Sequence, residues 1–243
     1  MRRSISLEAV MIRGIIFDFD GLIVDTEWAV YQSWVELFEA FGAELPLDQW
    51  TAIIGTSEHE HFDPFVVLEQ QVGKLPDHQN LRQQRRQREL ALVRAQPVLP
   101  GVEGYLREAR LQDLKLGIAS SSDRQWVLGN LARLGLLEYF DVVHTSDDVE
   151  RTKPDPTLYQ LALHSLEIEP KETFVLEDSP NGITAAKRAG IYTVAVPNLL
   201  TASLKLDHAD LLLDSLSQMP LADLIEVVEN HWSDQTLRTS ARG

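Results

Sequence analysis

The sequence has 243 residues, 44% of them hydrophobic, which suits one large domain or a core domain with a smaller insert. Its formal net charge of -15 at pH 7 argues against nucleic acid or an anionic membrane as the main partner. No apolar run reaches the roughly eighteen residues that a membrane-spanning helix needs, and the absence of cysteine excludes disulfide and thiolate chemistry. We expect a cytoplasmic protein that is a monomer or a weak dimer.

The first part of the chain is predicted to contain one strand followed by helices. Residues 12–19, IRGIIFDF, are apolar, β-branched and aromatic, as in a buried strand, and residues 1 to about 11 before them are expected to form an extension. Apolar residues then recur at helical spacing, with no convincing strand among them. The predicted helices lie at 28–41, 47–54, 58–72 and 78–95. The sequence QPVLPGV at 96–102 ends this stretch, because Pro and Gly interrupt regular structure.

After residue 102, predicted strands alternate with predicted helices. The strands are expected at 114–120, 141–146, 172–178, 191–196 and 209–214. The helices are expected at 102–112, 123–135, 154–166, 181–190 and 216–230. The polar tail from residue 233 onward is expected to be loose.

Together these elements predict an α/β fold with an insertion. Strands that alternate with helices form a parallel sheet with right-handed crossovers. The core is therefore expected to be a Rossmann-like parallel sheet built from residues 1–26 and 97–243. The helical stretch between the first strand and the others, residues 27–96, is expected to be an inserted all-α cap domain.

Four groups of polar residues follow predicted strands, and these are Asp18 with Asp20, the serines 120–122, Lys153, and Glu177 with Asp178. Ligands of open parallel sheets bind beyond the carboxyl ends of the strands, so we expect the four groups to meet at one edge. Side chains two positions apart on a strand share a face. Two carboxylates about 4 Å apart repel by roughly 4 kcal/mol at an effective dielectric near 20. Either a cation lies between Asp18 and Asp20, or one of them keeps a proton.

Phosphoryl transfer needs these groups in combination. An aspartate that coordinates Mg²⁺ can attack phosphorus while its neighbour acts first as an acid and then as a base. Glu177 and Asp178 add oxygen ligands, which suit Mg²⁺. The serine turn before a helix offers hydroxyl and N–H donors to an anion, and Lys153 adds positive charge.

Each motif also has a simpler explanation when taken alone. An Asp-x-Asp pair is often a solvated loop, a serine triplet is usually a turn with an N-cap, and KPDP and EDSPNG commonly precede helices. The functional explanation is favoured because all four groups follow strands of one α/β pattern. A further cluster, Arg82, Arg85, Arg86 and Arg88, either steers an anionic substrate or forms a solvated helix face, of which the solvated face is the simpler expectation.

Four segments resemble, in order and spacing, the motifs of the haloacid dehalogenase superfamily of phosphohydrolases: DFDGLIVDTE, GIASSS, KPDP and EDSPNGITAAKRAG. VLPGV is similar to the segment where the chain returns from a helical cap in the β-phosphoglucomutase-like and phosphoglycolate-phosphatase-like branch. The resemblance extends from about residue 12 to residue 225. It implies a Mg²⁺-dependent phosphatase that hydrolyses a small phosphorylated metabolite through an aspartyl-phosphate.

The resemblance also implies roles for the acidic residues. Asp18 would be the nucleophile, and Asp20 would protonate the leaving alcohol and then activate water. The Mg²⁺ ligands would be the Asp18 carboxylate, the Asp20 backbone carbonyl and Asp178, with Glu177 bound directly or through water.

Further roles concern the phosphoryl group. Ser120 and the Ser121 amide would bind it, and Lys153 would neutralise charge on it. The presence of Asp20 favours phosphate esters as substrates, since the dehalogenases of this superfamily lack the second Asp and need no Mg²⁺.

Two cap positions differ from the family's mutases. Val30 stands where the mutases have a His, and Glu58, three residues after Gly55, stands where they have an Arg for the substrate's second phosphate. An acidic group there would repel a phosphate, so we expect a phosphatase. The alternatives are a β-phosphoglucomutase-like sugar phosphomutase and, in another class, a non-catalytic phospho-sensing or partner-binding module.

Overall fold

The computed structural model describes residues 10–51 and 63–240, with the backbone alone for residues 236–240. Within these ranges six parallel strands form one sheet in the order β3-β2-β1-β4-β5-β6. The strands are β1 (Gly14–Phe17), β2 (Lys115–Ala119), β3 (Val142–His144), β4 (Thr173–Glu177), β5 (Tyr192–Ala195) and β6 (Leu211–Leu212). The predicted α/β fold with a parallel sheet is confirmed.

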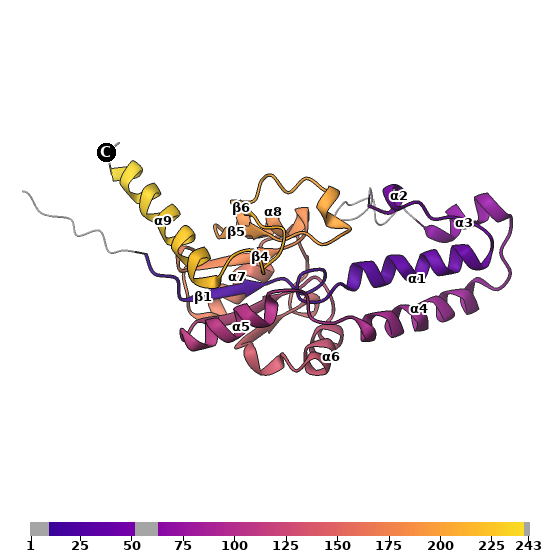
Figure 1. The fold of residues 1–243 in the computed structure, drawn as a ribbon, viewed down its shortest axis with the longest axis horizontal. Helices are drawn as coiled ribbons and strands as arrows, with labels where there is room; N and C mark the ends of the chain where they lie inside the picture. The colour runs from indigo at the N-terminus through magenta and orange to yellow at the C-terminus, as the bar shows by residue number, and fades with distance from the viewer. Residues whose placement is uncertain (1–9, 52–62, 241–243) are drawn as a thin grey trace, which may run out of the picture.

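Helices cover both faces of the sheet (Figure 1). They are α5 (Val102–Leu111), α6 (Arg124–Leu134), α7 (Thr157–Leu166), α8 (Pro180–Arg188) and α9 (Leu221–Ser240), with the short 3-10 helices η2 (Leu137–Tyr139), η3 (Ser146–Asp148), η4 (Pro170–Glu172) and η5 (Thr201–Ser203). Ile15 and Phe17 of β1 pack in the apolar cluster that includes α5, α6 and α9. Ile16 packs in the cluster that includes α7 and α8. This alternation follows from the two-residue period of a strand.

The central position of β1 determines where the chain can bind a ligand. All four residues of β1 are buried, as expected for a strand with neighbours on both sides and helices on both faces. Phe17 is in register with Ile118 of β2 and Leu176 of β4. The residues that directly follow β1, β2 and β4 therefore emerge together at the carboxyl edge of the sheet.

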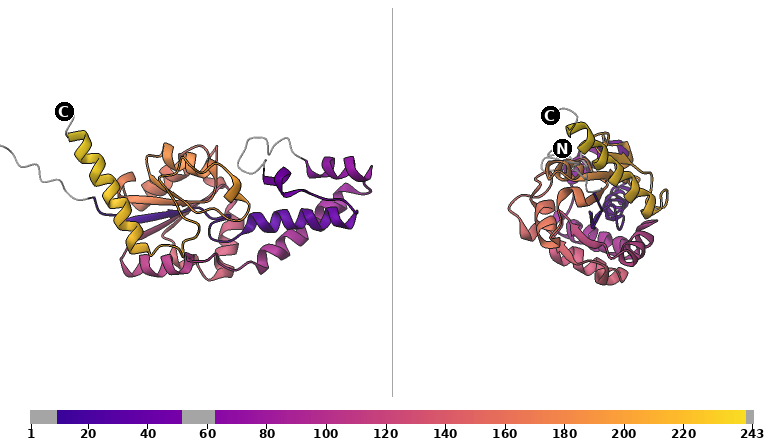
Figure 2. Two further views of the ribbon diagram at one scale, coloured as in Figure 1. Left: turned by 45° about the horizontal axis from the view of Figure 1, so that its top comes forward. Right: turned by 90° about the vertical axis from the view of Figure 1, so that its left-hand side faces the viewer.

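The helices of residues 26–51 and 64–95 project beyond this edge (Figures 1 and 2). They are α1 (Thr26–Ala40), α2 (Leu47–Thr51), α3 (Pro64–Val72) and α4 (His78–Ala95). Trp34, Phe38 and Phe65 belong to a buried cluster of their own. Arg88 of α4 donates two hydrogen bonds to Glu36 of α1, at 2.6 and 2.9 Å, which ties the two long helices together along their exposed side.

The two chain segments that join this helical part to the sheet contact each other. Val24, just before α1, forms an antiparallel bridge with Val98, which follows α4. The Leu99 N–H donates to the Ile23 carbonyl at 2.9 Å. Paired segments of this kind restrict how the four helices can tilt over the edge of the sheet.

Several predicted boundaries need correction. Each of the six predicted strands exists but is shorter than expected. The predicted helices at 47–54 and 58–72 correspond to α2 and α3, and their residues from 52 to 62 lie outside the described residues, as does the expected extension at residues 1–9. The expectation of a loose tail from residue 233 is wrong, because α9 continues to Ser240. Residues 221–240 contain neither Pro nor Gly, so nothing in the sequence ends this helix earlier. None of the described helices has both the length and the apolar content needed to cross a bilayer.

Candidate active site

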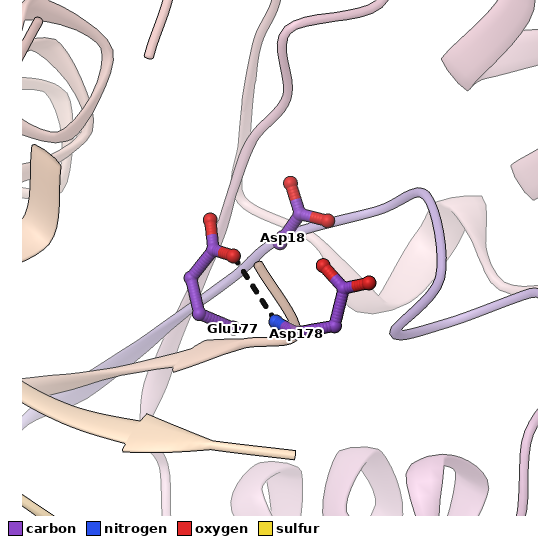
Figure 3. A group of neighbouring side chains, drawn as sticks. All are labelled: Asp18, Glu177 and Asp178. Atoms are coloured by element: carbon purple, nitrogen blue, oxygen red, sulfur yellow. Dashed lines mark hydrogen bonds between the residues drawn. The ribbon is translucent and has the colours of Figure 1, made fainter. Parts of the chain in front are cut away.

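Three carboxylates lie together at the carboxyl edge of the sheet (Figure 3). Asp18 directly follows β1, Glu177 is the last residue of β4, and Asp178 follows it. The three residues are 6%, 0% and 3% exposed, respectively. Each offers one carboxylate oxygen in a group whose atoms all lie within 4.8 Å of one another. The sequence prediction that these residues meet at one edge is confirmed by this arrangement.

Burial and mutual repulsion make this cluster difficult to ionise. Burial, opposed by Lys153 and assisted by Glu177 and Asp20, raises the pKa of Asp18 to about 8. Burial together with the charges of Asp18 and Glu177 raises the pKa of Asp178 well above its usual value. A positive charge placed among the oxygens would favour the ionised forms.

Lys153 supplies one positive charge, from the loop between β3 and α7. Its Nζ donates to Asp18 Oδ1 and, at 2.7 Å, to Glu177 Oε1, and its side chain is only 4% exposed. Burial lowers the pKa of Lys153, but the two carboxylates outweigh burial and raise the pKa above its usual value. One ammonium group faces three carboxylates, so the ionised cluster carries an excess of negative charge that a divalent cation would neutralise.

Glu177 is saturated with hydrogen-bond donors. Oε1 accepts from Lys153 and, at 2.6 Å, from the Tyr159 hydroxyl. Oε2 accepts from the Asp178 N–H at 3.0 Å and from the Ser179 N–H and hydroxyl, both at 3.1 Å. By contrast, Asp18 Oδ2 and Asp178 Oδ1 receive no hydrogen bond from the described residues. These two oxygens are the ones most available to a metal ion or a reacting atom.

Asn198, which follows the neighbouring strand β5, orients Asp178, and it was not among the predicted site residues. Its Nδ2 donates to Asp178 Oδ2 at 2.8 Å and to the Gly21 carbonyl at 3.2 Å. Its Oδ1 accepts from the N–H groups of Leu200 and Thr201, which fixes the orientation of the amide. A signal existed in the sequence, because Asn198 follows β5 just as the predicted site residues follow their own strands.

Asp20 does not join the carboxylate cluster, contrary to the expectation that it shares a face with Asp18. The chain leaves the strand after Phe17, and Gly21 has a φ of +81°, which turns the backbone. A Cβ at Gly21 would lie 2.3 Å from Asp178 Oδ2, so a larger residue would not fit this turn. The Asp20 carboxylate accordingly lies among hydroxyl and indole donors.

Four side chains donate hydrogen bonds to Asp20. Oδ1 accepts from the Thr26 hydroxyl and from Trp126 Nε1, both at 2.8 Å. Oδ2 accepts from the Ser122 hydroxyl at 2.6 Å and from the Ser120 hydroxyl at 3.4 Å. Thr26 and Trp126 were not among the predicted site residues, because their contacts with Asp20 depend on how α1 and α6 begin.

The three serines that follow β2 differ in their exposure and in their hydrogen bonds. Ser120 is buried and its hydroxyl also accepts from the Ser122 N–H at 3.0 Å, whereas Ser121 is exposed. The prediction named Ser120 and Ser121 as phosphate ligands and omitted Ser122, the third member of the triplet. Asp123 then caps α6 by accepting from the Trp126 N–H at 2.8 Å.

A cavity of about 410 Å³ opens between the sheet edge and the projecting helices. Residues from both parts line it, and they are Asp20, Thr26, Glu27, Val30, Arg86, Glu89, Ser121, Ser122, Asp123, Trp126 and Ser146. Burial, with repulsion from Asp20 and Asp25, raises the pKa of Glu27 to about 7. Most of the charged side chains that line the cavity are carboxylates, and Arg86 is the cation among them.

The arginine cluster of α4 is largely engaged within the protein. Arg82 pairs with Asp63, and Arg85 lies over the Trp34 ring and donates to Glu89. Arg86 also pairs with Glu89, which is 3% exposed, and lies over the ring of Trp126 with 5.3 Å between its Cζ and the ring centroid. The expected solvated face thus carries specific ion pairs, and Arg86 alone of the four lines the 410 Å³ cavity.

Comparison with known proteins gives consistent results. The family model described as haloacid dehalogenase-like hydrolase matches residues 15–196. YhcW of Bacillus subtilis (strain 168), which carries a phosphatase name without a stated substrate, is 47% identical over 216 residues, 89% of this chain and 97% of YhcW. A Thermotoga maritima protein named phosphorylated carbohydrates phosphatase is 32% identical over 177 residues, 73% of this chain and 81% of that protein. A crystal structure from Thermotoga maritima, described as a β-phosphoglucomutase, aligns with a TM-score of 0.74 at 30% identity, over 89% of this chain and 100% of that one.

Proposed function

This chain belongs to the haloacid dehalogenase-like hydrolase family and is a phosphomonoesterase, and we propose that it hydrolyses a small phosphorylated metabolite with Mg²⁺ and through a phosphorylated Asp18. The observation that carries the proposal is the position of Asp18. It is buried beside Lys153 and two further carboxylates, yet its Oδ2 receives no hydrogen bond from the described residues. A free carboxylate oxygen in such a site is suited to attack phosphorus.

In the first step, Asp18 Oδ2 forms a bond to phosphorus as the ester P–O bond breaks. Asp20 gives its proton to the leaving oxygen, so the alcohol departs neutral and Asp20 is left as a carboxylate. In the second step, a water molecule attacks the phosphorus of the aspartyl-phosphate, Asp20 takes a proton from that water, and the Asp18 carboxylate is released with inorganic phosphate. Asp20 therefore begins the next cycle protonated.

Lys153 would stabilise charge during both steps. Its ammonium group contacts Asp18 directly and can also approach a phosphoryl oxygen bound to that residue. Glu177 holds Lys153 in place, because its Oε1 accepts from the Lys153 ammonium group and from the Tyr159 hydroxyl. The Ser120 hydroxyl and the Ser121 amide, which precede α6, are proposed to bind the phosphoryl oxygens.

The donor set fits Mg²⁺, since it consists of oxygen atoms only and carries uncompensated negative charge. Asp18 and Asp178 would hold the ion directly, with the Asp20 backbone carbonyl as a third ligand. Glu177, whose oxygens are already engaged by donors, would act through a water molecule. When bound, the ion would neutralise the phosphoryl oxygens and keep Asp18 ionised at neutral pH.

The cavity supports a hydroxyl-rich leaving group, such as that of a sugar phosphate. Carboxylates and hydroxyls dominate its lining, and these groups can bond several substrate hydroxyls. The relative named phosphorylated carbohydrates phosphatase supports the same class. We propose that residues 27–96 form the cap that closes over this cavity, in a cytoplasmic protein that acts on a small molecule.

A sugar phosphomutase of this family would need a His at position 30 of the cap. Val30 lines the cavity and brings no imidazole to it, which supports hydrolysis over phosphoryl transfer within a sugar. Glu58 and Gly55, the other positions that separate the alternatives, lie outside the described residues. Incubation with β-glucose 1-phosphate and a bisphosphate activator distinguishes them: a phosphatase releases inorganic phosphate, whereas a mutase forms glucose 6-phosphate.

Single substitutions test the proposed roles. Asp18→Asn and Asp20→Asn should each abolish steady-state hydrolysis of p-nitrophenyl phosphate in Mg²⁺, and EDTA should reversibly abolish it in the wild type. Because p-nitrophenolate leaves without an acid, Asp20→Asn should accumulate phosphorylated Asp18, detectable by mass spectrometry. Unchanged turnover in Asp18→Asn would reject the nucleophile. A stable phosphoryl adduct of the wild type, with no turnover on any ester, would instead favour the non-catalytic sensing module.

A further inference from the structure

Trp126 contacts Asp20 across 106 positions of sequence. Its Nε1–H donates to Asp20 Oδ1 at 2.8 Å. The other donors to this carboxylate are the hydroxyls of Thr26, Ser120 and Ser122. A hydroxyl can rotate and can either donate or accept, whereas an indole N–H can only donate. Trp126 is thus the fixed donor of this set.

The position of the indole is set by the start of α6. Asp123 caps the helix through the Trp126 N–H, which places the residue in the first turn. Arg124, in the same turn, donates to Asp148 Oδ1 at 2.7 Å and to Oδ2 at 2.6 Å, and its own N–H donates to Asp147 at 2.7 Å. These bonds anchor the turn to the loop that follows β3. The indole therefore reaches Asp20 from a helix start that is hydrogen-bonded to the segment after β3.

The projecting helices also contact Trp126, through the face of its ring. The Arg86 guanidinium of α4 lies over the Trp126 ring, and Glu89, which is buried, holds that guanidinium. Arg85 also pairs with Glu89 and donates to Ser33 of α1 at 3.1 Å. A continuous set of contacts thus connects the helices above the cavity, through the indole ring, to the carboxylate of Asp20.

We propose that Trp126 is a positioning residue that holds the Asp20 carboxyl group toward the leaving oxygen of the substrate through its indole N–H. With Oδ1 fixed against an obligate donor, Oδ2 is the oxygen that carries and transfers the proton. The two serine hydroxyls beside Oδ2 can switch between donating and accepting as the proton moves. This inference rests on the proposed function, because it assigns Trp126 to the acid step of that reaction.

The test compares leaving groups in Trp126→Phe, which removes the N–H but keeps an aromatic ring beneath Arg86. For a series of aryl phosphates from p-nitrophenyl to phenyl phosphate, the acid matters more as the leaving phenol becomes less acidic. We expect kcat/KM to fall about tenfold with phenyl phosphate and less than about twofold with p-nitrophenyl phosphate. Trp232→Phe on α9, at the opposite end of the sheet, is the matched control and should retain the wild-type dependence.

The outcomes separate this inference from the proposed function. An equal loss on every ester, or no loss, in Trp126→Phe would overturn the positioning role while leaving the phosphatase intact. A wild-type protein that hydrolyses none of the esters would overturn both.

A second measurement does not require the Trp126 variant to fold. The chain has five tryptophans, whose ¹⁵N-labelled indole N–H signals are separately observable by NMR. Asp20→Ala should move one of them upfield, and single Phe substitutions at Trp28, Trp34, Trp50 and Trp232 should identify it as Trp126 by elimination. A Trp126 signal unmoved in Asp20→Ala would overturn the proposal.

Discussion

Gly182 of α8 lies directly against the carboxylate of Glu177. A Cβ at position 182 would come within 1.7 Å of Glu177 Oε1 and 1.9 Å of its carboxyl carbon, closer than any non-bonded atoms can approach. Oε1 is the oxygen that accepts from Lys153 and Tyr159. The absence of a side chain at one helical position therefore allows a buried carboxylate to reach the lysine beside Asp18.

Gly182→Ala should for this reason damage activity more than a helical Gly→Ala change normally would. The added methyl group must displace Glu177, so that Lys153 loses one of its two carboxylate partners. We expect kcat for p-nitrophenyl phosphate to fall by about 100-fold and the free energy of unfolding to fall by about 2 kcal/mol. Steady-state kinetics and urea denaturation measure the two effects.

Gly104→Ala is the matched control. Gly104 lies within α5, and a Cβ there would meet nothing within 4 Å. Because Ala has the higher helix propensity, this change should raise the free energy of unfolding by up to about 1 kcal/mol without altering kcat. Similar kinetics for the two variants would show that the Gly182 contact has no catalytic consequence.

Asn198→Ala should weaken metal binding. The Asn198 amide donates to Asp178 Oδ2 and fixes how that carboxylate faces the cluster. Loss of an outer hydrogen bond of this kind typically costs about 10- to 100-fold in metal affinity. Titration calorimetry with Mg²⁺ measures the change, with Asn80→Ala at an exposed position of α4 as the control. Equal Mg²⁺ affinity in both variants would contradict the orienting role of Asn198.

The stability of the metal-free protein should fall as the pH rises. Asp18 has a pKa of about 8 in the folded chain and a usual value of 3.8, so between these values the native state retains a proton that the unfolded state has lost. Stability then decreases with rising pH, by about 1 kcal/mol per pH unit for each proton concerned. His144, whose pKa burial lowers from 6.5, acts in the opposite direction only below that pH.

Asp178 and Glu27, whose pKa values are also raised, act in the same direction as Asp18, and the window free of the opposing His144 contribution is about pH 6.5 to about pH 8. In EDTA the Tm, followed by circular dichroism, should decline across this window, and Mg²⁺ should reduce the decline because the cation replaces the proton. Asp18→Asn should also show a smaller decline than the wild type. A Tm in EDTA that rises with pH across the window would contradict the raised pKa of Asp18.

The strands could be predicted from the sequence because a parallel sheet that is covered on both faces needs continuous apolar runs. GIIF in β1 is such a run and ends at Asp18, and TFVL in β4 is another and ends at Glu177. The prediction of a loose tail is wrong because a polar segment can extend a helix whose first part is buried. The first part of α9 buries Leu221, Leu224 and Val228 against the core, and the polar residues that follow extend the same helix.

The candidate site was only partly predictable for a geometric reason. Asp18, Glu177 and Asp178 follow strands whose register the apolar pattern fixes, so their meeting could be expected. Trp126 and Asn198 reach the site through a helix start and a loop, and their contacts depend on side-chain directions that no periodicity encodes. The direction of the Asp20 carboxylate likewise depends on the turn at Gly21, where the chain no longer follows strand geometry.

Lys153→Met should separate metal binding from catalysis. Removal of the ammonium group leaves Asp18 and Glu177 without their cation, so the cluster becomes more negative. Coulombic repulsion between Lys153 and a divalent ion disappears as well, and we expect Mg²⁺ to bind at least about tenfold more tightly. At the same time kcat should fall by about 1,000-fold, because the transition state loses the charge that faces the phosphoryl oxygens.

Calorimetric Mg²⁺ titration and kinetics at saturating Mg²⁺ measure these opposed effects. Lys187→Met serves as the control, since Lys187 pairs with Asp210 at the surface, at 2.6 Å, and does not contact the cluster. Weaker Mg²⁺ binding in Lys153→Met would mean that the lysine organises the carboxylates for the ion and does not compete with it. Tighter binding with lost turnover is the result that the buried charge balance requires, because three carboxylates share one lysine in the folded chain.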